Sequence, residues 1–95
     1  MVHVMASIVV KPEHAAAAKA QLLELAGKTR GEPGCVAYEL FQRPDMPHVF
    51  RTVEEWRTQG DVDAHMKTPH VAAAIAVAVP MFVAPLDIIS YTKVG

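Results

Sequence analysis

The fold is predicted from one segment near the start of the chain, Val2-His3-Val4-Met5-Ala6-Ser7-Ile8-Val9-Val10, which is followed by Lys11-Pro12. Its β-branched residues, and the proline that ends it, are typical of a strand. Side chains alternate between the faces of a strand, and neither alternating set here carries a carboxylate, a lysine or an arginine. We therefore expect both faces of this strand to be covered.

The residues that follow predict a helix and then a pair of antiparallel strands. Pro12-Glu13 favours a helix start, and Gly31 together with Pro33-Gly34 ends the helix. A short proline-containing turn then joins the two strands, which makes them antiparallel neighbours. The strand, the turn and the second strand span Cys35–Arg43, Pro44–Pro47 and His48–Trp56.

The rest of the chain predicts further helix and a final strand. Gly60-Asp61 opens a short helix through Met66, and Thr68-Pro69 begins another that stops at Pro80. Leu86–Val94 is the last strand. The order β-α-β-β-α-β is that of the ferredoxin-like α+β fold. Residues 1–95 are therefore predicted to form a single domain, a four-stranded antiparallel sheet with two helical segments on one face.

This fold leaves the other face of the sheet open, and the first strand makes an entirely polar open face impossible. A chain of 95 residues also buries only roughly 60–68% of its unfolded surface, which favours association. We therefore predict a homodimer that packs sheet against sheet, a dimeric α+β barrel.

Composition excludes several classes of function. The chain is 52% apolar and 20% charged, which is typical of a folded domain. Nine basic residues face ten acidic ones without a basic cluster, so no nucleic-acid partner is expected. The longest apolar run, Val71–Leu86, contains two prolines and is shorter than the ~20 residues of a membrane span. The lone Cys35 and the absence of a signal-peptide pattern predict a soluble cytoplasmic protein without membrane partners.

A candidate site lies at the third strand and the helix after it. Alternation places Phe50, Glu54 and Trp56 on one strand face, and His65 follows on the helix with Asp61 one turn earlier. A carboxylate one turn away can hold an imidazole in one tautomer, so these residues could line a pocket with a base. The alternative is structural, with His65 and Trp56 as core residues and Asp61–His65 as a surface pair.

No metal or nucleotide cofactor is predicted. His65 and His70 are five residues apart with a proline between them, whereas two metal ligands on one helix face are three or four apart. Cys35 has no partner cysteine and is more typical of a small buried apolar residue than of a nucleophile. Glycine-rich phosphate loops and dinucleotide fingerprints are absent.

The chain resembles, over nearly its whole length, the antibiotic biosynthesis monooxygenase (ABM) domain family of small dimeric α+β-barrel proteins. The nearest resemblance is to the cofactor-free quinol monooxygenases, whose helix carries a similar Ala-His-Leu-x-Thr-Pro-His segment. The segments that carry the resemblance are Glu32-Pro33-Gly34-Cys35 with Tyr38, Glu54-Glu55-Trp56, Ala64-His65-Met66-Lys67-Thr68-Pro69-His70 and Pro85-Leu86.

The resemblance implies a monooxygenase that oxidises a quinol or aromatic polyketide with O₂ and no cofactor. A base removes a phenolic proton, and the anion passes an electron to O₂ in a dry pocket. His65 fits the base, and Tyr38 or Ser7 would donate a hydrogen bond to the developing oxyanion. The resemblance assigns the aromatic slot to Trp56, Phe50, Phe41 and Phe82, beside Glu54.

Two further activities on this scaffold remain open: a non-catalytic binder of aromatic small molecules, and an isomerase of a phosphorylated signalling sugar. The isomerases share the Thr-Pro-His segment, but a phosphate would need arginine or lysine in an otherwise apolar pocket. Haem degradation is disfavoured because His65 and Ile75 stand where the haem-degrading members carry a tryptophan and an axial histidine. The chain also has no asparagine, which the polyketide-quinone oxygenases and the haem-degrading members use in the pocket.

Overall fold

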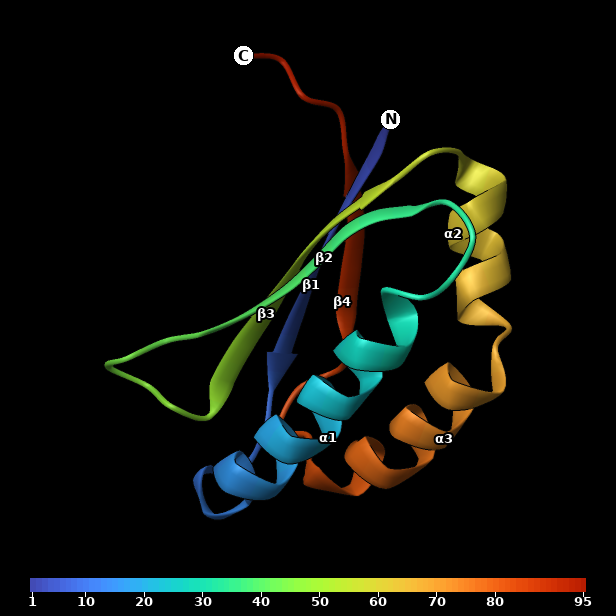
Figure 1. The fold of residues 1–95 in the computed structure, drawn as a ribbon. Helices are drawn as coiled ribbons and strands as arrows, with labels where there is room; N and C mark the ends of the chain where they lie inside the picture. The colour runs from blue at the N-terminus through green and yellow to red at the C-terminus, as the bar shows by residue number, and fades with distance from the viewer.

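A four-stranded antiparallel sheet forms one layer of the molecule, and helices form the other (Figure 1). The structure, a computed structural model, describes residues 1–95. The strands lie in the order β2-β3-β1-β4, so the first strand is paired on both sides, with β3 and with β4. This arrangement confirms the predicted ferredoxin-like α+β fold. The strand bounds are β1 Val2–Val9, β2 Cys35–Gln42, β3 Val49–Trp56 and β4 Asp87–Tyr91.

The helices all lie on the same side of the sheet (Figure 1). The predicted break in the second helical region is confirmed, because the Thr68 hydroxyl caps a new helix and Pro69 occupies its first turn. None of the helices is both long and apolar enough to cross a lipid bilayer. Their bounds are α1 Ala15–Thr29, α2 Gln59–Met66 and α3 Pro69–Ala78, with short 3₁₀ turns η1 Pro12–His14 and η2 Val79–Met81.

Two of the element ends that differ from the prediction have a clear local reason. Helix α2 begins at Gln59 rather than at Gly60 because the hydroxyl of Thr58 accepts a hydrogen bond from the backbone N–H of Asp61, at 3.1 Å. The last strand ends at Tyr91 rather than at Val94. Tyr91 pairs with His3 at the start of β1, so the residues beyond it have no neighbouring strand to bond.

The core lies between the sheet and the helices, as the alternation in β1 predicts. Val4, Ala6, Ile8 and Val10 point to the helices and are all buried. Val4 belongs to one of two core clusters, and Ile8 and Val10 belong to the other. The first cluster contains Val4, Ala26, Tyr38, Trp56 and Val62, and the second contains Ile8, Val10, Ala18, Leu22 and Phe50.

No helix covers the opposite face of the sheet (Figure 1). Strand register places Met5 and Val53 there as one pair and Ser7 and Arg51 as another. Large apolar side chains on this face are exposed, among them Phe41, which is 53% exposed. The open face is therefore mixed in character: β1 presents the apolar Met5 and Val9 beside His3 and Ser7, and β3 adds charged side chains.

Candidate functional site

A cavity of about 70 Å³, open on one side to solvent, lies between the helix face of the sheet and the helices. We call it the central pocket. Three small residues, Ala6 on β1 and Ala74 and Ala78 on α3, line it, and their short side chains leave room that larger ones would fill. Its apolar wall is completed by residues that include Ile8, Leu22, Leu25, Val62, Ile75 and Leu86.

The few polar groups of the central pocket come from β2, β3 and α2. They are the side chains of Tyr38, Thr52, Glu54 and His65, and no lysine or arginine lines the pocket. A mostly apolar cavity with a few converging polar groups is the usual form of a small-molecule site. The absence of a cationic side chain makes it unsuited to a phosphate or another strongly anionic group.

Glu54 is a buried carboxylate held by its neighbours on the same strand face. One of its oxygens accepts a hydrogen bond from the Thr52 hydroxyl at 2.6 Å, and the other accepts one from the Trp56 indole N–H at 3.0 Å. The Thr52 oxygen also accepts from the backbone N–H of Ala6, at 3.2 Å. These bonds offset the unfavourable burial of a charge and fix the carboxylate at the pocket wall.

Tyr38 faces Glu54 across the β2–β3 pairing and lines the same pocket. Burial, with a further contribution from the negative charge of Glu54, raises the pKa of the Tyr38 hydroxyl well above its ordinary value. The phenol therefore stays neutral at physiological pH. A neutral phenol in an apolar pocket can donate a hydrogen bond to an oxygen that gains negative charge.

His65 on α2 is buried and lies between two aromatic rings. Its ring centroid is 4.8 Å from that of Trp56 and 5.9 Å from that of Tyr38. Its Nδ1 atom lies 2.7 Å from a carboxylate oxygen of Glu32, at the end of the loop that follows α1. An ionised carboxylate can only accept, so Nδ1 carries the proton and the Nε2 lone pair is left free.

The expected partner of His65 was Asp61, and this prediction is wrong. Asp61 lies in the first turn of α2, where its carboxylate accepts a hydrogen bond from the Thr58 hydroxyl at 2.9 Å. The helix N-terminus and its capping hydroxyl are the nearer and more favourable partners for a carboxylate at that position. The orienting carboxylate of His65 comes instead from Glu32, 33 residues away in the sequence.

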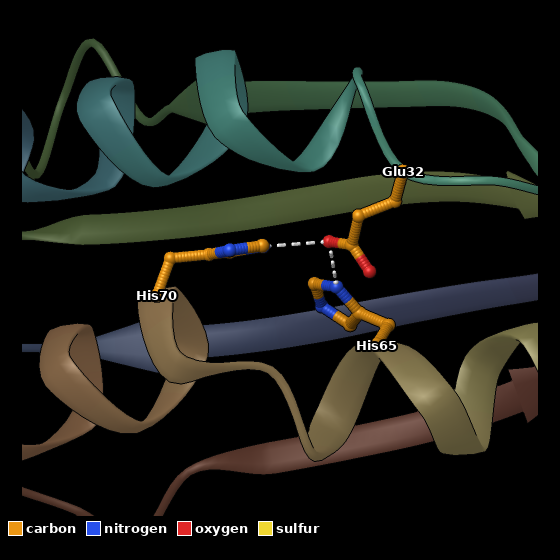
Figure 2. Close-up of side chains that lie close together, drawn as sticks. All are labelled: Glu32, His65 and His70. Atoms are coloured by element: carbon orange, nitrogen blue, oxygen red, sulfur yellow. Dashed lines mark hydrogen bonds and ion pairs between the residues drawn. The ribbon is translucent and has the colours of Figure 1, made fainter.

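A second imidazole shares the same carboxylate oxygen. The Nε2 atom of His70, on the first turn of α3, lies 2.8 Å from the Glu32 oxygen that also contacts His65 (Figure 2). Sequence patterns predict no site role for Glu32, and the spacing of His70 from His65 argues against a shared metal site. Helical spacing placed the two histidines on different faces, but the break at Thr68-Pro69 turns α3 so that both rings point to one oxygen. We call Glu32, His65 and His70 the Glu32 cluster.

The other predicted site residues divide by sheet face. Phe82 lines the central pocket, whereas Trp56 is fully buried and packs behind His65. Phe50 is buried in the core cluster around Leu22 and does not line the pocket. Register places Ser7 and Phe41 opposite Arg51, on the sheet face away from the helices. Within one chain, Tyr38 is therefore the candidate oxyanion donor.

The topology and the partly open apolar pocket define a ferredoxin-like α+β protein with a candidate small-molecule site. The family model described as "Antibiotic biosynthesis monooxygenase" matches residues 1–77. The chain belongs to this family, as its resemblance indicates.

Relatives and solved structures agree with that assignment over nearly the full chain. "Putative monooxygenase YcnE" of Bacillus subtilis (strain 168) is 28% identical over 89 residues, which are 94% of each protein. A crystal structure of an antibiotic biosynthesis monooxygenase is 29% identical with a TM-score of 0.94, and each chain is covered fully. PA3566 from Pseudomonas aeruginosa is 26% identical with a TM-score of 0.91, over 99% of this chain and 94% of that one. Family and names support a monooxygenase-type enzyme that acts on a small molecule.

Proposed function

We propose that the protein is a cofactor-independent monooxygenase that oxidises a quinol or a related aromatic polyketide with O₂. The observation that carries this proposal is the setting of His65. Its Nδ1 is hydrogen bonded to Glu32, outside the central pocket, while the ring itself lines the pocket. The free Nε2 atom is then the proton acceptor that faces a bound guest.

The proposed reaction begins with a proton transfer. Nε2 of His65 takes a phenolic proton, and the charge of Glu32 stabilises the resulting imidazolium. The phenolate passes one electron to O₂, and the substrate radical and superoxide combine at a ring carbon. The resulting peroxide anion takes the proton back from His65, and the hydroperoxide then loses water as its ring carbon becomes a carbonyl. One naphthohydroquinone and one O₂ thereby give one hydroxynaphthoquinone and one water, and all electrons come from the substrate.

The other polar groups of the pocket fit an uncharged, hydroxyl-bearing aromatic substrate. The neutral Tyr38 phenol donates to the oxygen on which charge develops, and the Glu54 carboxylate can accept from a second hydroxyl. The pocket has no lysine or arginine, which speaks against a phosphorylated sugar as substrate. Ile75 in the wall offers no ligand to haem iron.

The assembly that we propose is a homodimer through the open face of the sheet. Exposed apolar side chains of β2 and β4, such as Phe41 and Ile89, support it. A second copy that packs sheet against sheet would remove them from water.

The test is oxygen consumption by the purified protein with a naphthohydroquinone as substrate. His65→Ala should lower the turnover number by about 10²–10⁴-fold, since it removes the base. With ¹⁸O₂, mass spectrometry should find one labelled oxygen in the quinone product. His14→Ala is the matched control because His14 lies in η1, outside the central pocket.

The outcome that contradicts the proposal is oxygen uptake at the uncatalysed rate. If the quinone then also quenches the fluorescence of Trp56, the protein is a binder of aromatic compounds rather than an oxygenase. The only tryptophan in the chain packs on His65, so its emission reports on the pocket.

A further inference from the structure

The Glu32 cluster contains a histidine that the proposed reaction does not use. We propose that Glu32, His65 and His70 bind a divalent transition-metal ion, best matched by Zn²⁺. We also propose that the bound ion converts His65 from a proton acceptor into a hydrogen-bond donor toward the central pocket. This second statement rests on the proposed function, whereas the metal site itself does not.

The donor atoms have the identity and spacing that such a site needs. Nδ1 of His65, Nε2 of His70 and a carboxylate oxygen of Glu32 all lie within 4.8 Å of one another. Two imidazoles and one carboxylate are a frequent protein ligand set for Zn²⁺, with water at the fourth position. Bonds of about 2.0–2.2 Å in a tetrahedral site separate the ligand atoms by roughly 3.3 Å. The Glu32 oxygen, at 2.7 and 2.8 Å from the nitrogens, would move slightly outward, and the two nitrogens would approach each other by up to about 1.5 Å from a separation within 4.8 Å.

The three ligands come from three different segments that converge on one point (Figure 2). Glu32 follows α1, His65 lies in the last turn of α2 and His70 lies in the first turn of α3. The Thr68 hydroxyl bonds the backbone oxygen of His65 at 2.8 Å and also caps α3, which holds the two histidines in a fixed relation. A cation could therefore bind with small side-chain movements and no change of fold.

Charge and burial also favour a cation. The Glu32 side chain is 10% exposed, and its only ion-pair partners are the two imidazoles. No lysine or arginine neutralises it. The His70 side chain is 20% exposed and also borders a separate surface hollow between α1 and α3, which gives a route from solvent. A partly buried carboxylate without a permanent cation attracts a metal ion more strongly than an exposed one.

The position of the cluster determines what the ion would do. His65 lines the central pocket, but Glu32 and His70 do not. The ion would therefore sit behind the imidazole, and it would not touch a substrate. With the metal on Nδ1, the ring proton moves to Nε2, which then donates toward the pocket instead of accepting. Occupancy of this site would switch off the base.

The first experiment is calorimetric titration of the metal-free protein with ZnCl₂, with Co²⁺ absorption as a second readout. We expect one Zn²⁺ per chain, and visible bands of tetrahedral Co²⁺ that Zn²⁺ displaces. Glu32→Gln and His70→Asn should each weaken binding at least about tenfold, the loss that even outer-shell changes produce. His14→Asn, which alters a histidine outside the cluster, should bind as the wild type does. Circular dichroism establishes that each variant is folded.

Two results would overturn the metal site: no saturable Zn²⁺ binding, or binding that Glu32→Gln and His70→Asn leave unchanged. The second would mean that the ion sits elsewhere on the surface. Binding is measured without substrate, so a protein that binds Zn²⁺ through the cluster but is inactive when metal-free refutes the proposed function and not the site.

The switch has its own readout. Zn²⁺ should lower oxygen uptake of the wild type, and it should not lower that of His70→Asn relative to the same variant without metal. If Zn²⁺ binds through the cluster and the wild-type rate of oxygen uptake does not change, the proposed effect of the ion on His65 is refuted, whereas the proposed metal site is not.

Discussion

Glu32 is the residue that holds the His65 imidazole in one tautomer. It binds the imidazole on the side away from the central pocket, so it determines which nitrogen is available inside. In the proposed reaction this carboxylate acts through the imidazole and not on the substrate, so we class it as a positioning residue. Its effect should therefore appear in the turnover number rather than in substrate affinity.

Glu32→Gln keeps the size of the side chain and removes its charge. We expect kcat for quinol oxidation to fall about 10–100-fold, because the imidazolium loses its counter-charge, while KM changes little. Steady-state oxygen uptake measures both constants. Glu24→Gln on the exposed face of α1 is the control. A rise in KM at unchanged kcat would show that Glu32 contacts substrate instead.

Tyr38 makes stability depend on pH at the alkaline end. Its folded-state pKa is raised by burial above the ordinary 10.0, so the unfolded chain ionises first. Below pH 10 the phenol is protonated in both states and the stabilisation is fully present. Above it, the free energy of unfolding should fall by up to about 1.4 kcal/mol per pH unit, until the folded phenol ionises too.

Urea unfolding between about pH 9 and 11 checks this dependence. Tyr38→Phe should show a shallower loss of stability with rising pH than the wild type, because it has no phenol to ionise. Tyr91→Phe serves as control, since Tyr91 is 44% exposed on β4. Equal slopes for wild type and Tyr38→Phe would refute the assignment of the alkaline transition to this residue.

At the scale of elements, the turn between α1 and β2 places Glu32 in reach of α2. Gly34 in that turn has a φ of +82°, and a Cβ atom there would collide with the side chain of Asp61. Only glycine meets both conditions without strain. Asp61, which was expected to orient His65, thus packs against the turn that contains Gly34 and positions Glu32 beside His65.

A matched pair of glycine substitutions tests this turn. Gly34→Ala should lower the free energy of unfolding by about 1–3 kcal/mol, because it adds backbone strain and a steric clash. Gly27→Ala, inside α1 with no atom within 4 Å of the new Cβ, should raise it by roughly 0.5–1 kcal/mol. Chemical denaturation of both variants gives the comparison, and a Gly34→Ala protein as stable as the wild type would contradict it.

Local patterns predicted the elements well because each depends on nearby residues. The proline at Thr68-Pro69, the alternation in β1 and the turn at Pro44–Pro47 each act within a few positions, and the structure confirms all of them. The Glu32 cluster was beyond such reasoning. It joins residues 33 and 38 positions apart, and helical spacing says nothing about two histidines on separate helices. The sheet register, which separates Ser7 and Phe41 from the pocket, likewise depends on pairing between distant strands.

For the whole molecule, the uncovered sheet face (Figure 1) is the feature that supports the proposed homodimer. We expect sedimentation equilibrium at micromolar concentration to give twice the chain mass of 10.3 kDa. Val53→Asp, which places a charge at the centre of that face, should shift the protein toward monomer. Leu23→Asp, on an exposed part of α1, should not. A wild-type monomer under these conditions would refute the dimer.

The alanines at positions 6, 74 and 78 have a consequence for how the chain behaves when a guest arrives. Because their side chains are short, the space between the sheet and α3 is not filled, and a bound aromatic molecule can make the contacts that longer side chains would otherwise make. A compound present at 100 times its Kd would then raise the free energy of unfolding by about 2.7 kcal/mol. The melting temperature alone could thus rank unlabelled compounds by affinity. Replacing one of these alanines with leucine should raise the melting temperature of the ligand-free protein, because the longer side chain fills the same space.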